Sequence, residues 1–310
     1  MYRILTDDDL KQALDMPAVV ACIEQAIAAR AEGALVAPPR FAVEAGEGGL
    51  VFTAGAETRY AKVVGFRVYD TYPDDSHDHE QLVAVFDSQT GALRGVLIGR
   101  LAGALRTAAI NAVAIRHMAR PGAQVLGVLG AGFQAGYHLQ AAAAVRPFTR
   151  VLVYSRSAGR RQAFAAHWAA QTGLPVQALD AAEAVVRQAD VLICATNSTT
   201  PVLDAAWVRP GTHVNTIGPK FAGASETPPE LAQRSRVIAC DSPQQAAAYG
   251  RPFFLSGTPE WERMVDLSEI VTGRRPGRHS EQDITLFCSV GLAGTEVALA
   301  AAALQVTTDR

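Results

Sequence analysis

The residues with the clearest chemical pattern are two glycines one residue apart in the stretch VLGVLGAGFQAGYHL. They begin the sequence G-x-G-x-x-A, in which Gly130 permits a tight turn after an apolar strand and Gly132 lets the backbone approach a pyrophosphate. Ala135 is small enough for the following helix to pack on the sheet. Phe133 and Gln134 open that helix, whose N-terminal N–H groups favour anions. The pattern predicts that Gly130, Gly132, Phe133 and Gln134 bind a dinucleotide.

The end of the next predicted strand indicates which dinucleotide is preferred. An NAD site usually has an Asp or Glu there, which accepts hydrogen bonds from the ribose 2′-hydroxyl. The stretch VLVYSRSAGRR instead offers Ser155, Arg156, Ser157, Arg160 and Arg161. Guanidinium and hydroxyl groups hold a 2′-phosphate, which a carboxylate would repel. We therefore predict a preference for NADP(H); the alternative is that Arg156 only covers the adenine face and that NAD(H) binds as well.

The elements that must position these residues follow from hydrophobic periodicity. From residue 123 onward, strand and helix patterns alternate. The candidate strands are AQVLGVLG, RVLVYS, DVLICAT, GTHVNTIG and RVIACD, and the candidate helices include FQAGYHLQAAAAV and AGRRQAFAAHWAAQTG. This alternation predicts an α/β fold with a parallel, doubly wound sheet of the Rossmann type.

The rest of the chain predicts a second, discontinuous α+β domain. A single helical pattern covers residues 7–33, and the strand candidates RFAVEA, GLVFTAGAE, YAKVVGFRVYD and the hairpin QLVAVFDSQTGALRGVLIG follow it. GALRTAAINAVAIRHMAR predicts a helix, and the alanine-rich tail predicts another that returns to this domain. We therefore expect residues 1–115 and 291–310 to form one domain, with the Rossmann domain, residues 116–290, inserted in it.

Bulk composition argues against several classes of protein. The chain has 310 residues, of which 49% are hydrophobic, and a formal net charge of −2, which gives no electrostatic reason to expect nucleic acid or an anionic membrane as a partner. The acidic start does not resemble a signal peptide, and the apolar stretches are too short or interrupted to span a bilayer. Four widely spaced cysteines without a CxxC pair indicate reduced thiols and a cytoplasmic location. The cluster SHDHE is expected to be a solvated loop, and no metal site is predicted.

Several motifs resemble those of the ornithine cyclodeaminase/mu-crystallin family. They are ALRTAA, GVLGAGFQAGYHL, ATNSTTPVL, GTHVNTIG and SVGLA, and the combination of RTAA with GAGxQAxxH is specific to the family. The resemblance spans nearly the whole chain. It implies a homodimer held together by the discontinuous domain, with a small imino or amino acid bound between that domain and the nicotinamide. The activities of the family include ornithine cyclodeamination, alanine dehydrogenation and ketimine reduction.

The resemblance also implies a set of site residues. Arg40 in APPRF, Lys62 in YAKVVG and Arg106 in LRTAA would together bind a substrate carboxylate, which suits a guanidinium because it grips a carboxylate through two hydrogen bonds. Thr107 is expected to contact phosphate or nicotinamide. The further positions expected to border the cofactor are Thr196, Asn197, Val290 and Gly291.

One loop departs from the family pattern. Cyclodeaminases of the family have an aspartate two residues after the glycine that aligns with Gly218, and that carboxylate is assigned to deamination. In this chain the position is Lys220, within NTIGPKFAGASE. A lysine cannot act as a carboxylate base and would repel the side-chain ammonium of ornithine. The alternative is a shifted alignment with Glu226 as the substitute, although the spacing of Gly218, Gly223 and Glu226 argues against it.

These motifs predict an NAD(P)H-dependent reductase of cyclic imino acids. Its substrates would be Δ1-pyrroline-2-carboxylate or Δ1-piperideine-2-carboxylate, and its products L-proline or L-pipecolate. The cationic residues would place the imine carbon against the nicotinamide. The predicted catalytic residues are Arg106, Lys62 as the first candidate proton donor, and Lys220 as the second. The alternatives are an ornithine cyclodeaminase, an alanine dehydrogenase and, less favoured, an NADP-binding protein without turnover.

Overall fold

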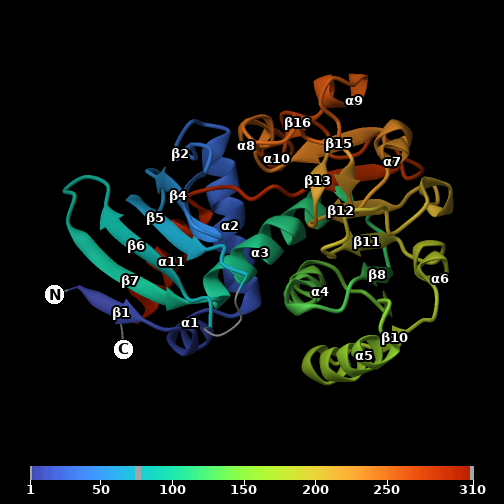
Figure 1. The fold of residues 1–310 in the computed structure, drawn as a ribbon, viewed down its shortest axis with the longest axis horizontal. Helices are drawn as coiled ribbons and strands as arrows, with labels where there is room; N and C mark the ends of the chain where they lie inside the picture. Colours follow the sequence, from blue (N-terminus) through green and yellow to red (C-terminus); the bar gives the residue numbers. More distant parts are fainter. Residues whose placement is uncertain (1, 74–77, 308–310) are drawn as a thin grey trace. The chain divides into compact units, whose positions relative to one another are not determined.

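The computed structural model describes residues 2–73 and 78–307, and Figure 1 shows their fold. Two residues of the SHDHE cluster, Ser76 and His77, lie outside the described residues. His79 lies within them and contacts Asp70, with Nδ1 2.8 Å from a carboxylate oxygen. The expected solvated loop is therefore described only in part.

The chain divides into two compact units. Unit 1 comprises Met1–Ala109 and Gly291–Arg310, and unit 2 comprises Ile110–Val290. The division falls inside helix α3 (Leu101–Met118), whereas the sequence led us to expect a boundary after residue 115. A boundary inside a continuous helix leaves no loop, linker or composition change by which a sequence could mark it.

Unit 1 is built on a largely antiparallel sheet with the strand order β1-β7-β6-β5-β4-β2, to which β3 adds by pairing with β4. Strand β1 pairs parallel to β7, and the other neighbours pair antiparallel. The predicted hairpin is confirmed, because β6 and β7 flank a turn in which Gly91 has φ 73°. The strands are β1 (Arg3–Leu5), β2 (Leu35–Val36), β3 (Phe41–Ala45), β4 (Gly48–Glu57), β5 (Val63–Asp70), β6 (Gln81–Asp87) and β7 (Leu93–Gly99).

The helix predicted over residues 7–33 is in fact two helices, α1 (Asp7–Ala13) and α2 (Met16–Arg30). The Asp15 side chain caps α2 by accepting the Ala18 N–H at 2.9 Å. Pro17 fits the first turn of α2 but has no N–H with which to continue α1. The prediction of one continuous helix was therefore wrong, because this capping signal lies inside an otherwise helical pattern.

Helix α11 (Thr295–Val306) packs against strands β4 to β7 and against α2. Glycines in the strands allow this close approach: a Cβ on Gly55 would lie 2.6 Å from the Gly294 Cα, and one on Gly65 would lie 3.1 Å from the Val297 side chain. The alanine-rich tail thus forms a buried helix of unit 1, as Figure 1 shows where the red helix lies against the blue strands.

Unit 2 has a parallel, doubly wound sheet with the strand order β10-β9-β8-β11-β12-β17-β15-β16, so the predicted fold class is confirmed. Strand β17 was not predicted: its residues were read only as the start of the C-terminal tail, yet they insert between β12 and β15. The strands are β8 (Val125–Leu129), β9 (Arg150–Tyr154), β10 (Val176–Ala178), β11 (Val191–Cys194), β12 (His213–Thr216), β15 (Val237–Cys240), β16 (Val265–Asp266) and β17 (Thr285–Cys288).

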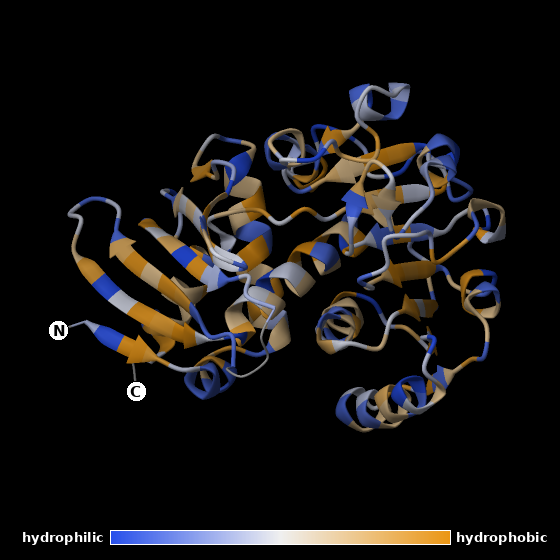
Figure 2. Ribbon diagram, viewed as in Figure 1, coloured by the Kyte–Doolittle hydropathy of each residue, from blue (hydrophilic) through white to orange (hydrophobic). Residues whose placement is uncertain are grey.

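Helices cover both faces of this sheet. On β8, Leu126 and Val128 belong to one hydrophobic cluster, with α4 and α5, whereas Leu129 belongs to another, with α6 to α8. Figure 2 shows hydrophobic residues along β8 and β11 and a mixture of hydrophilic and hydrophobic residues along α5. The helices are α4 (Phe133–Val145), α5 (Ala158–Thr172), α6 (Ala182–Val186), α7 (Pro229–Arg234), α8 (Pro243–Ala247), α9 (Pro259–Glu262) and α10 (Leu267–Val271).

The smaller elements of unit 2 matter for the site. A 3-10 turn, η1 (Ala205–Trp207), follows β11, and a short antiparallel hairpin of β13 (Lys220–Phe221) and β14 (Ala224–Ser225) follows β12. Among the described helices, none is long and apolar enough to cross a membrane.

Candidate active site

The predicted glycine turn lies between β8 and α4, at the carboxyl end of the parallel sheet, and its two glycines serve different purposes. Gly130 has φ 118°, and a Cβ there would lie 2.3 Å from the Ala195 carbonyl oxygen. Only a glycine therefore lets the turn pass this close to the end of β11. Gly132 precedes the first residue of α4, and a Cβ there would meet no described atom within 4 Å. Gly132 therefore leaves open space at a helix N-terminus, where a phosphate is stabilised.

The first turn of α4 supports this site. The Phe133 side chain is 52% exposed and contacts the Tyr137 ring edge-on, whereas Ala135 is buried against the sheet. His138 Nδ1 lies 2.7 Å from the Gln134 carbonyl oxygen and donates to it when the ring is neutral. Burial lowers the pKa of His138 to about 4, so the imidazole is neutral at pH 7.

The residues after β9 divide into two groups. Arg156, Ser157 and Arg160 are exposed, and the Ser157 hydroxyl accepts the Arg160 N–H at the start of α5. Arg161 is buried, donates to the Ser155 carbonyl oxygen at 3.2 Å and pairs with Asp180. Arg156 and Arg160 are therefore available to a ligand, whereas Arg161 holds the strand end together.

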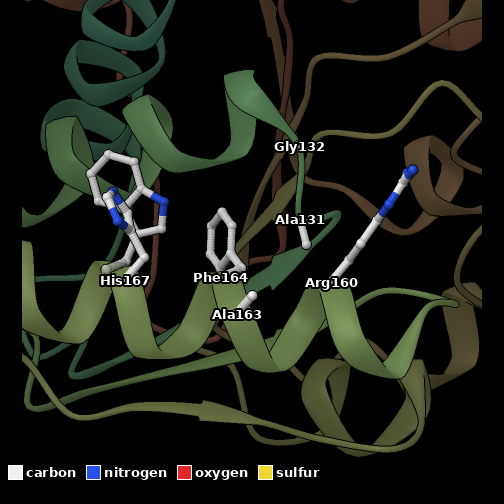
Figure 3. Close-up of a pocket in the computed structure, with 7 residues that line it drawn as sticks. Ala131, Gly132, Arg160, Ala163, Phe164 and His167 are labelled. Atoms are coloured by element: carbon white, nitrogen blue, oxygen red, sulfur yellow. The ribbon is translucent and has the colours of Figure 1, made fainter.

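A pocket of about 480 Å³ opens between the glycine turn and one side of α5. Figure 3 shows the Arg160 side chain extending from α5 on the side where Ala131 and Gly132 lie, with Phe164 and His167 farther along the same helix. The lining residues are Ala131, Gly132, Arg160, Ala163, Phe164, His167 and Trp168. A dinucleotide carrying a 2′-phosphate fits this donor set, because an open helix N-terminus and an exposed guanidinium both favour phosphate.

Unit 1 contains the second group of candidate residues, which we name the arginine cluster: Arg40, Arg67, Arg106 and Glu296. Arg67 Nη1 and Arg106 Nη2 lie 3.8 Å and 4.0 Å from the same Glu296 carboxylate oxygen. That oxygen also accepts the Thr53 hydroxyl at 2.7 Å. All three ionised side chains of this contact are at least nine-tenths buried, so their charges interact with little screening by water.

Tyr69 connects Arg40 to the cluster. Arg40 Nη1 donates to the Tyr69 hydroxyl at 3.4 Å, and the Arg67 guanidinium carbon lies 4.2 Å from the centre of the Tyr69 ring. Arg67 Nε also donates to Gln81 Oε1 at 2.9 Å. A Cβ on Gly103 would lie 2.8 Å from Arg67 Nη2, so α3 approaches this guanidinium closely only because residue 103 is a glycine.

Arg106 presents the chemically most informative atoms of the cluster. Its side chain is buried, yet Nε and Nη1 have no hydrogen-bond partner among the described residues. A Cβ on Gly291, where φ is 89°, would lie 3.1 Å from Nη1, so the glycine keeps the space beside this guanidinium open. Unpaired, buried donors of a permanent cation are the pattern expected at an anion site.

Burial and neighbouring charges perturb the pKa values in the cluster. The pKa of Arg67 is lowered to about 10, first by burial and then by Arg106 and Arg40, so the side chain is still cationic at pH 7. Burial raises the pKa of Glu296, but Arg106, Arg67 and the Thr53 hydroxyl outweigh it and leave this pKa below the ordinary value. Perturbed groups gathered at one place are typical of functional sites.

Sequence reasoning identified Arg40 and Arg106 but missed Arg67 and Glu296. A usable signal existed for both, because Arg67 lies in phase with the buried residues Val63 and Gly65 on β5, and Glu296 is the only acidic residue of the alanine-rich helix α11. Buried charges at apolar positions are rare unless they are paired or functional.

The third predicted cation, Lys62, lies in the turn before β5, where it has φ 53°. Its backbone carbonyl accepts the Ser88 N–H at 3.0 Å and Arg94 Nη2 at 3.2 Å, and its side chain is exposed. These contacts fix the backbone and leave the ammonium in solvent, outside the hydrogen bonds of the arginine cluster. A non-glycine residue held at positive φ costs about 1–3 kcal/mol, and such residues gather at functional sites.

Lys220 on β13 is buried, and its Nζ donates to the Gly218 carbonyl oxygen. Burial lowers the pKa of Lys220, whereas Glu226 opposes this shift. The fully buried Glu226 carboxylate accepts the Thr196 N–H and hydroxyl at 2.9 and 2.8 Å. It also accepts the Thr216 hydroxyl at 2.8 Å and the N–H groups of Ile217 and Gly218 at 3.0 and 2.6 Å. Glu226 is therefore fully engaged in joining the ends of β11 and β12, which argues against a role as a substitute base.

Of the remaining predicted positions, Thr107 and Val290 have structural partners, and Asn197 is exposed. The Thr107 hydroxyl donates to the Gly103 carbonyl oxygen at 2.7 Å within α3. Val290 N donates to Asp241 Oδ1 at 2.8 Å. Asn197, after β11, is exposed. Within residues 2–73 and 78–307, no group of three or more His, Cys, Asp or Glu side chains is placed to hold a metal ion.

Comparison with known proteins places this geometry in a family. The chain is 31% identical over 252 residues to iminosuccinate reductase from Paracoccus denitrificans, covering 79% of this chain and 78% of that protein. The solved structure of that reductase in complex with NAD+ has a TM-score of 0.91 at 27% identity and covers 99% of this chain and 97% of its own. Ketimine reductase mu-crystallin from Mus musculus is 31% identical over 243 residues, covering 78% and 74%.

A further solved structure is similar over the full length. Δ1-pyrroline-2-carboxylate reductase from Thermococcus litoralis, in complex with NADH and L-proline, has a TM-score of 0.90 at 26% identity and covers 99% of this chain and 97% of its own. The model of the ornithine cyclodeaminase/mu-crystallin family matches residues 2–307. The resemblance inferred from the motifs is thus confirmed, and the chain belongs to the ornithine cyclodeaminase/mu-crystallin family.

Proposed function

We propose that this protein is an NAD(P)H-dependent oxidoreductase that reduces the C=N bond of small imino acids, with Δ1-pyrroline-2-carboxylate and Δ1-piperideine-2-carboxylate as its substrates. The observation that carries the proposal is the buried Arg106 guanidinium, whose Nε and Nη1 have no hydrogen-bond partner in the described structure. A substrate carboxylate would satisfy both donors at once. Relatives named for the reduction of iminosuccinate, ketimines and pyrroline-2-carboxylate support this substrate class.

The dinucleotide would be held by unit 2. Gly130 and Gly132 shape the turn, and the first N–H groups of α4 face the open space beside Gly132, where a pyrophosphate would be stabilised. When bound, the reduced nicotinamide supplies the hydride. Because two solved relatives are complexes with NADH or NAD+, binding of NAD(H) is part of the proposal.

A preference for NADP(H) is the finer part of this proposal. It rests on the exposed side chains of Arg156, Ser157 and Arg160 and on the absence of a carboxylate at the end of β9, whose last residue is Tyr154. Guanidinium groups pair with a 2′-phosphate and gain nothing from a 2′-hydroxyl. The measurement that tests it is the ratio of the dissociation constants of NADPH and NADH.

In the proposed reaction, the residues of unit 1 bind and orient the acid. Arg106, assisted by Arg40, would hold the carboxylate next to the imine carbon, and holding a reactant in place supplies much of the rate acceleration. The iminium is already electrophilic, so little acid catalysis is required. Lys62 is the proposed proton donor on the family pattern, and its exposed side chain would have to turn towards the arginine cluster to act. Lys220 is less suited, since its Nζ is buried and donates to the Gly218 carbonyl oxygen.

Cyclodeamination of ornithine is the competing reaction within the family. Lys220 occupies the position of the carboxylate that the cyclodeaminase pattern requires, and Glu226 has no spare acceptor geometry after five hydrogen bonds. We therefore place reduction first.

The experiment is an initial-rate assay with both cyclic imino acids, each with NADPH and NADH, beside an assay of ammonia release from L-ornithine and of alanine oxidation. The proposal expects oxidation of the reduced dinucleotide with the cyclic imines and no ammonia from ornithine. Release of ammonia without imine reduction would make the protein a cyclodeaminase. Saturable binding of NADPH without turnover of any substrate would make it a binding protein.

We propose in addition that unit 1, besides holding the substrate carboxylate, forms a homodimer contact. The face of its sheet turned away from α11 exposes apolar side chains on neighbouring strands, and an exposed apolar patch of this kind marks an interaction surface. These side chains include Phe41 and Val43 on β3, Leu50 on β4 and Val64 on β5. Light scattering after size exclusion is expected to give twice the chain mass, and Val64→Asp is expected to shift it to the monomer. A monomeric wild-type protein would contradict this part.

A further inference from the structure

The arginine cluster carries positive charge that a zwitterionic substrate, with one iminium and one carboxylate, cannot balance. The two guanidinium groups of Arg67 and Arg106 share a single carboxylate, Glu296, at 3.8 and 4.0 Å, so this buried trio has a net charge of about +1 at pH 7. An iminium with one carboxylate is a zwitterion and brings no net charge. Binding such a substrate therefore leaves the excess positive charge in place.

Arg67 cannot relieve this excess by moving into solvent. Its side chain is 9% exposed, Nε donates to Gln81, the guanidinium lies over the Tyr69 ring, and α3 approaches it at Gly103. It is also close enough to Arg106 and Arg40 for both to disfavour its charge. A buried cation beside like charges is costly, and its retention is explained most simply by an anion that binds there.

We propose that Arg67 is a specificity-determining residue that provides a second anion-binding position, so that the site prefers imino acids with a second carboxylate over those with one. Arg106, with its unpaired Nε and Nη1, takes the carboxylate next to the imine carbon, and the guanidinium groups of Arg67 and Arg40, which both contact Tyr69, take the other. With the second carboxylate bound, the charges of substrate, Arg67, Arg106 and Glu296 balance. The inference rests on the proposed function, since it concerns the same site.

The experiment uses stable products in place of unstable imines. L-Aspartate and L-asparagine have nearly the same shape and differ by one negative charge, and so do L-glutamate and L-glutamine. Each is titrated by calorimetry into the protein saturated with NADPH, a combination in which no turnover occurs because amino acid and dinucleotide are both reduced. We expect the acidic member of at least one pair to bind about tenfold or more tightly than its amide, which equals about 1.4 kcal/mol. Equal affinities within both pairs would overturn the inference.

Variants assign the effect to Arg67. Arg67→Gln is expected to abolish most of the acid-to-amide ratio, and Arg67→Lys is expected to retain part of it. Arg3→Gln is the matched control, because Arg3 lies in the same unit but bonds to Thr307 and Leu304 instead of to the cluster. An unchanged ratio in a folded Arg67→Gln variant would refute the assignment, and if that variant does not fold, the Arg67→Lys and wild-type ratios decide.

The outcomes also separate this inference from the proposed function. Reduction of cyclic imines and binding of L-proline, with no preference for the acidic amino acids, would leave the proposed function standing and remove the second anion-binding position. Tight binding of L-aspartate or L-glutamate without reduction of either cyclic imine would support the second anion-binding position and contradict the proposed function.

Discussion

The glycine turn of unit 2 and the arginine cluster of unit 1 are both suited to anions, but they are built in opposite ways. The turn takes its donors from backbone N–H groups of consecutive residues, and its side chains are absent, small or neutral. The cluster takes its donors from side chains that come from the loop before β3, from β5 and from α3, and all of them carry charge. The first is a property of a local sequence, whereas the second exists only once the sheet and helices have assembled.

The two regions also treat buried ionisable groups differently. His138, one turn into α4, is neutral at pH 7 because burial lowers its pKa to about 4. Arg67 is also buried, in unit 1, but keeps its charge, since a pKa of about 10 lies far above neutral pH. The region of the backbone turn thus buries a neutral histidine, whereas the arginine cluster buries charged groups. The two regions are therefore expected to respond differently to mutation and to pH.

The largest expected effect is on catalysis through Arg106. Arg106→Ala removes the unpaired Nε and Nη1, and we expect kcat/KM for the best imino acid to fall about thirtyfold or more, a loss of about 2–5 kcal/mol of transition-state stabilisation, while the NADPH dissociation constant stays nearly constant. Initial rates at varied substrate concentration measure the loss. Arg3→Gln, which removes a guanidinium elsewhere in unit 1, should keep wild-type rates, and a fully active Arg106→Ala enzyme would refute the carboxylate role.

The second effect is on stability in acid and concerns the turn region. Because the folded-state pKa of His138 lies below the unfolded value of 6.5, the unfolded chain binds protons more tightly. The stabilisation is fully present above about pH 6.5 and is lost as the pH falls towards 4, to a total of about 3 kcal/mol. The thermal midpoint measured between pH 7.5 and 4.5 should therefore fall less steeply for His138→Gln than for the wild type. His167→Gln changes an exposed histidine on α5 and should keep the wild-type slope; equal slopes for all three proteins would contradict the assignment.

The third effect separates the two glycines of the turn. Gly130→Ala places a Cβ 2.3 Å from a backbone oxygen at a φ of 118°, and we expect it to cost about 2 kcal/mol of folding stability. Gly132→Ala meets no described atom within 4 Å, so its stability should change by less than about 0.5 kcal/mol. The added methyl group would nevertheless stand where the pyrophosphate approaches, and NADPH affinity should fall about tenfold or more. Denaturant titration and fluorescence titration with NADPH measure the two quantities; a Gly132→Ala protein that binds normally would remove the turn from the site.

The smallest expected effect concerns the exposed guanidinium in the pocket of Figure 3. Arg160→Ala should raise the NADPH dissociation constant about fivefold, equal to about 1 kcal/mol, because water screens an exposed charge pair. The NADH dissociation constant should change by less than about twofold. Arg187→Ala, at the end of α6, is the control for loss of one surface charge in unit 2. Parallel weakening of both dinucleotides would show that Arg160 does not recognise the 2′-phosphate.

The sequence was sufficient for the parallel sheet of unit 2, because each of its early strands and helices has a local hydrophobic period and the glycine turn follows a strand directly. The sequence did not predict β17, because its four residues continue directly into the C-terminal tail. They form a strand only by pairing with β12 and β15, which come earlier in the chain. The sequence also failed at the break between α1 and α2, where the cap at Asp15 is a short signal inside a long helical pattern.

For the candidate site, the residues that belong to a sequence motif were identified, and those that are brought to the site only by the fold were overlooked. Arg106 is recognisable because it lies in RTAA, whereas Arg67 and Glu296 belong to no motif and meet across more than two hundred residues of chain. Their contact is decided by the packing of α11 on the sheet, which in turn depends on small residues such as Gly55. Long-range pairs of this kind cannot be read from spacing.

The bonds around Glu226 have a consequence for how this loop could change during evolution. Lys220 lies near enough to Glu226 to be stabilised by its charge, and a carboxylate in place of Lys220 would face that buried anion directly. An aspartate at residue 220 is therefore expected to need a cation close by, either from another side chain of the loop or from a bound molecule. Replacing Lys220 with aspartate alone is therefore expected to destabilise this loop and not to create a deaminating site.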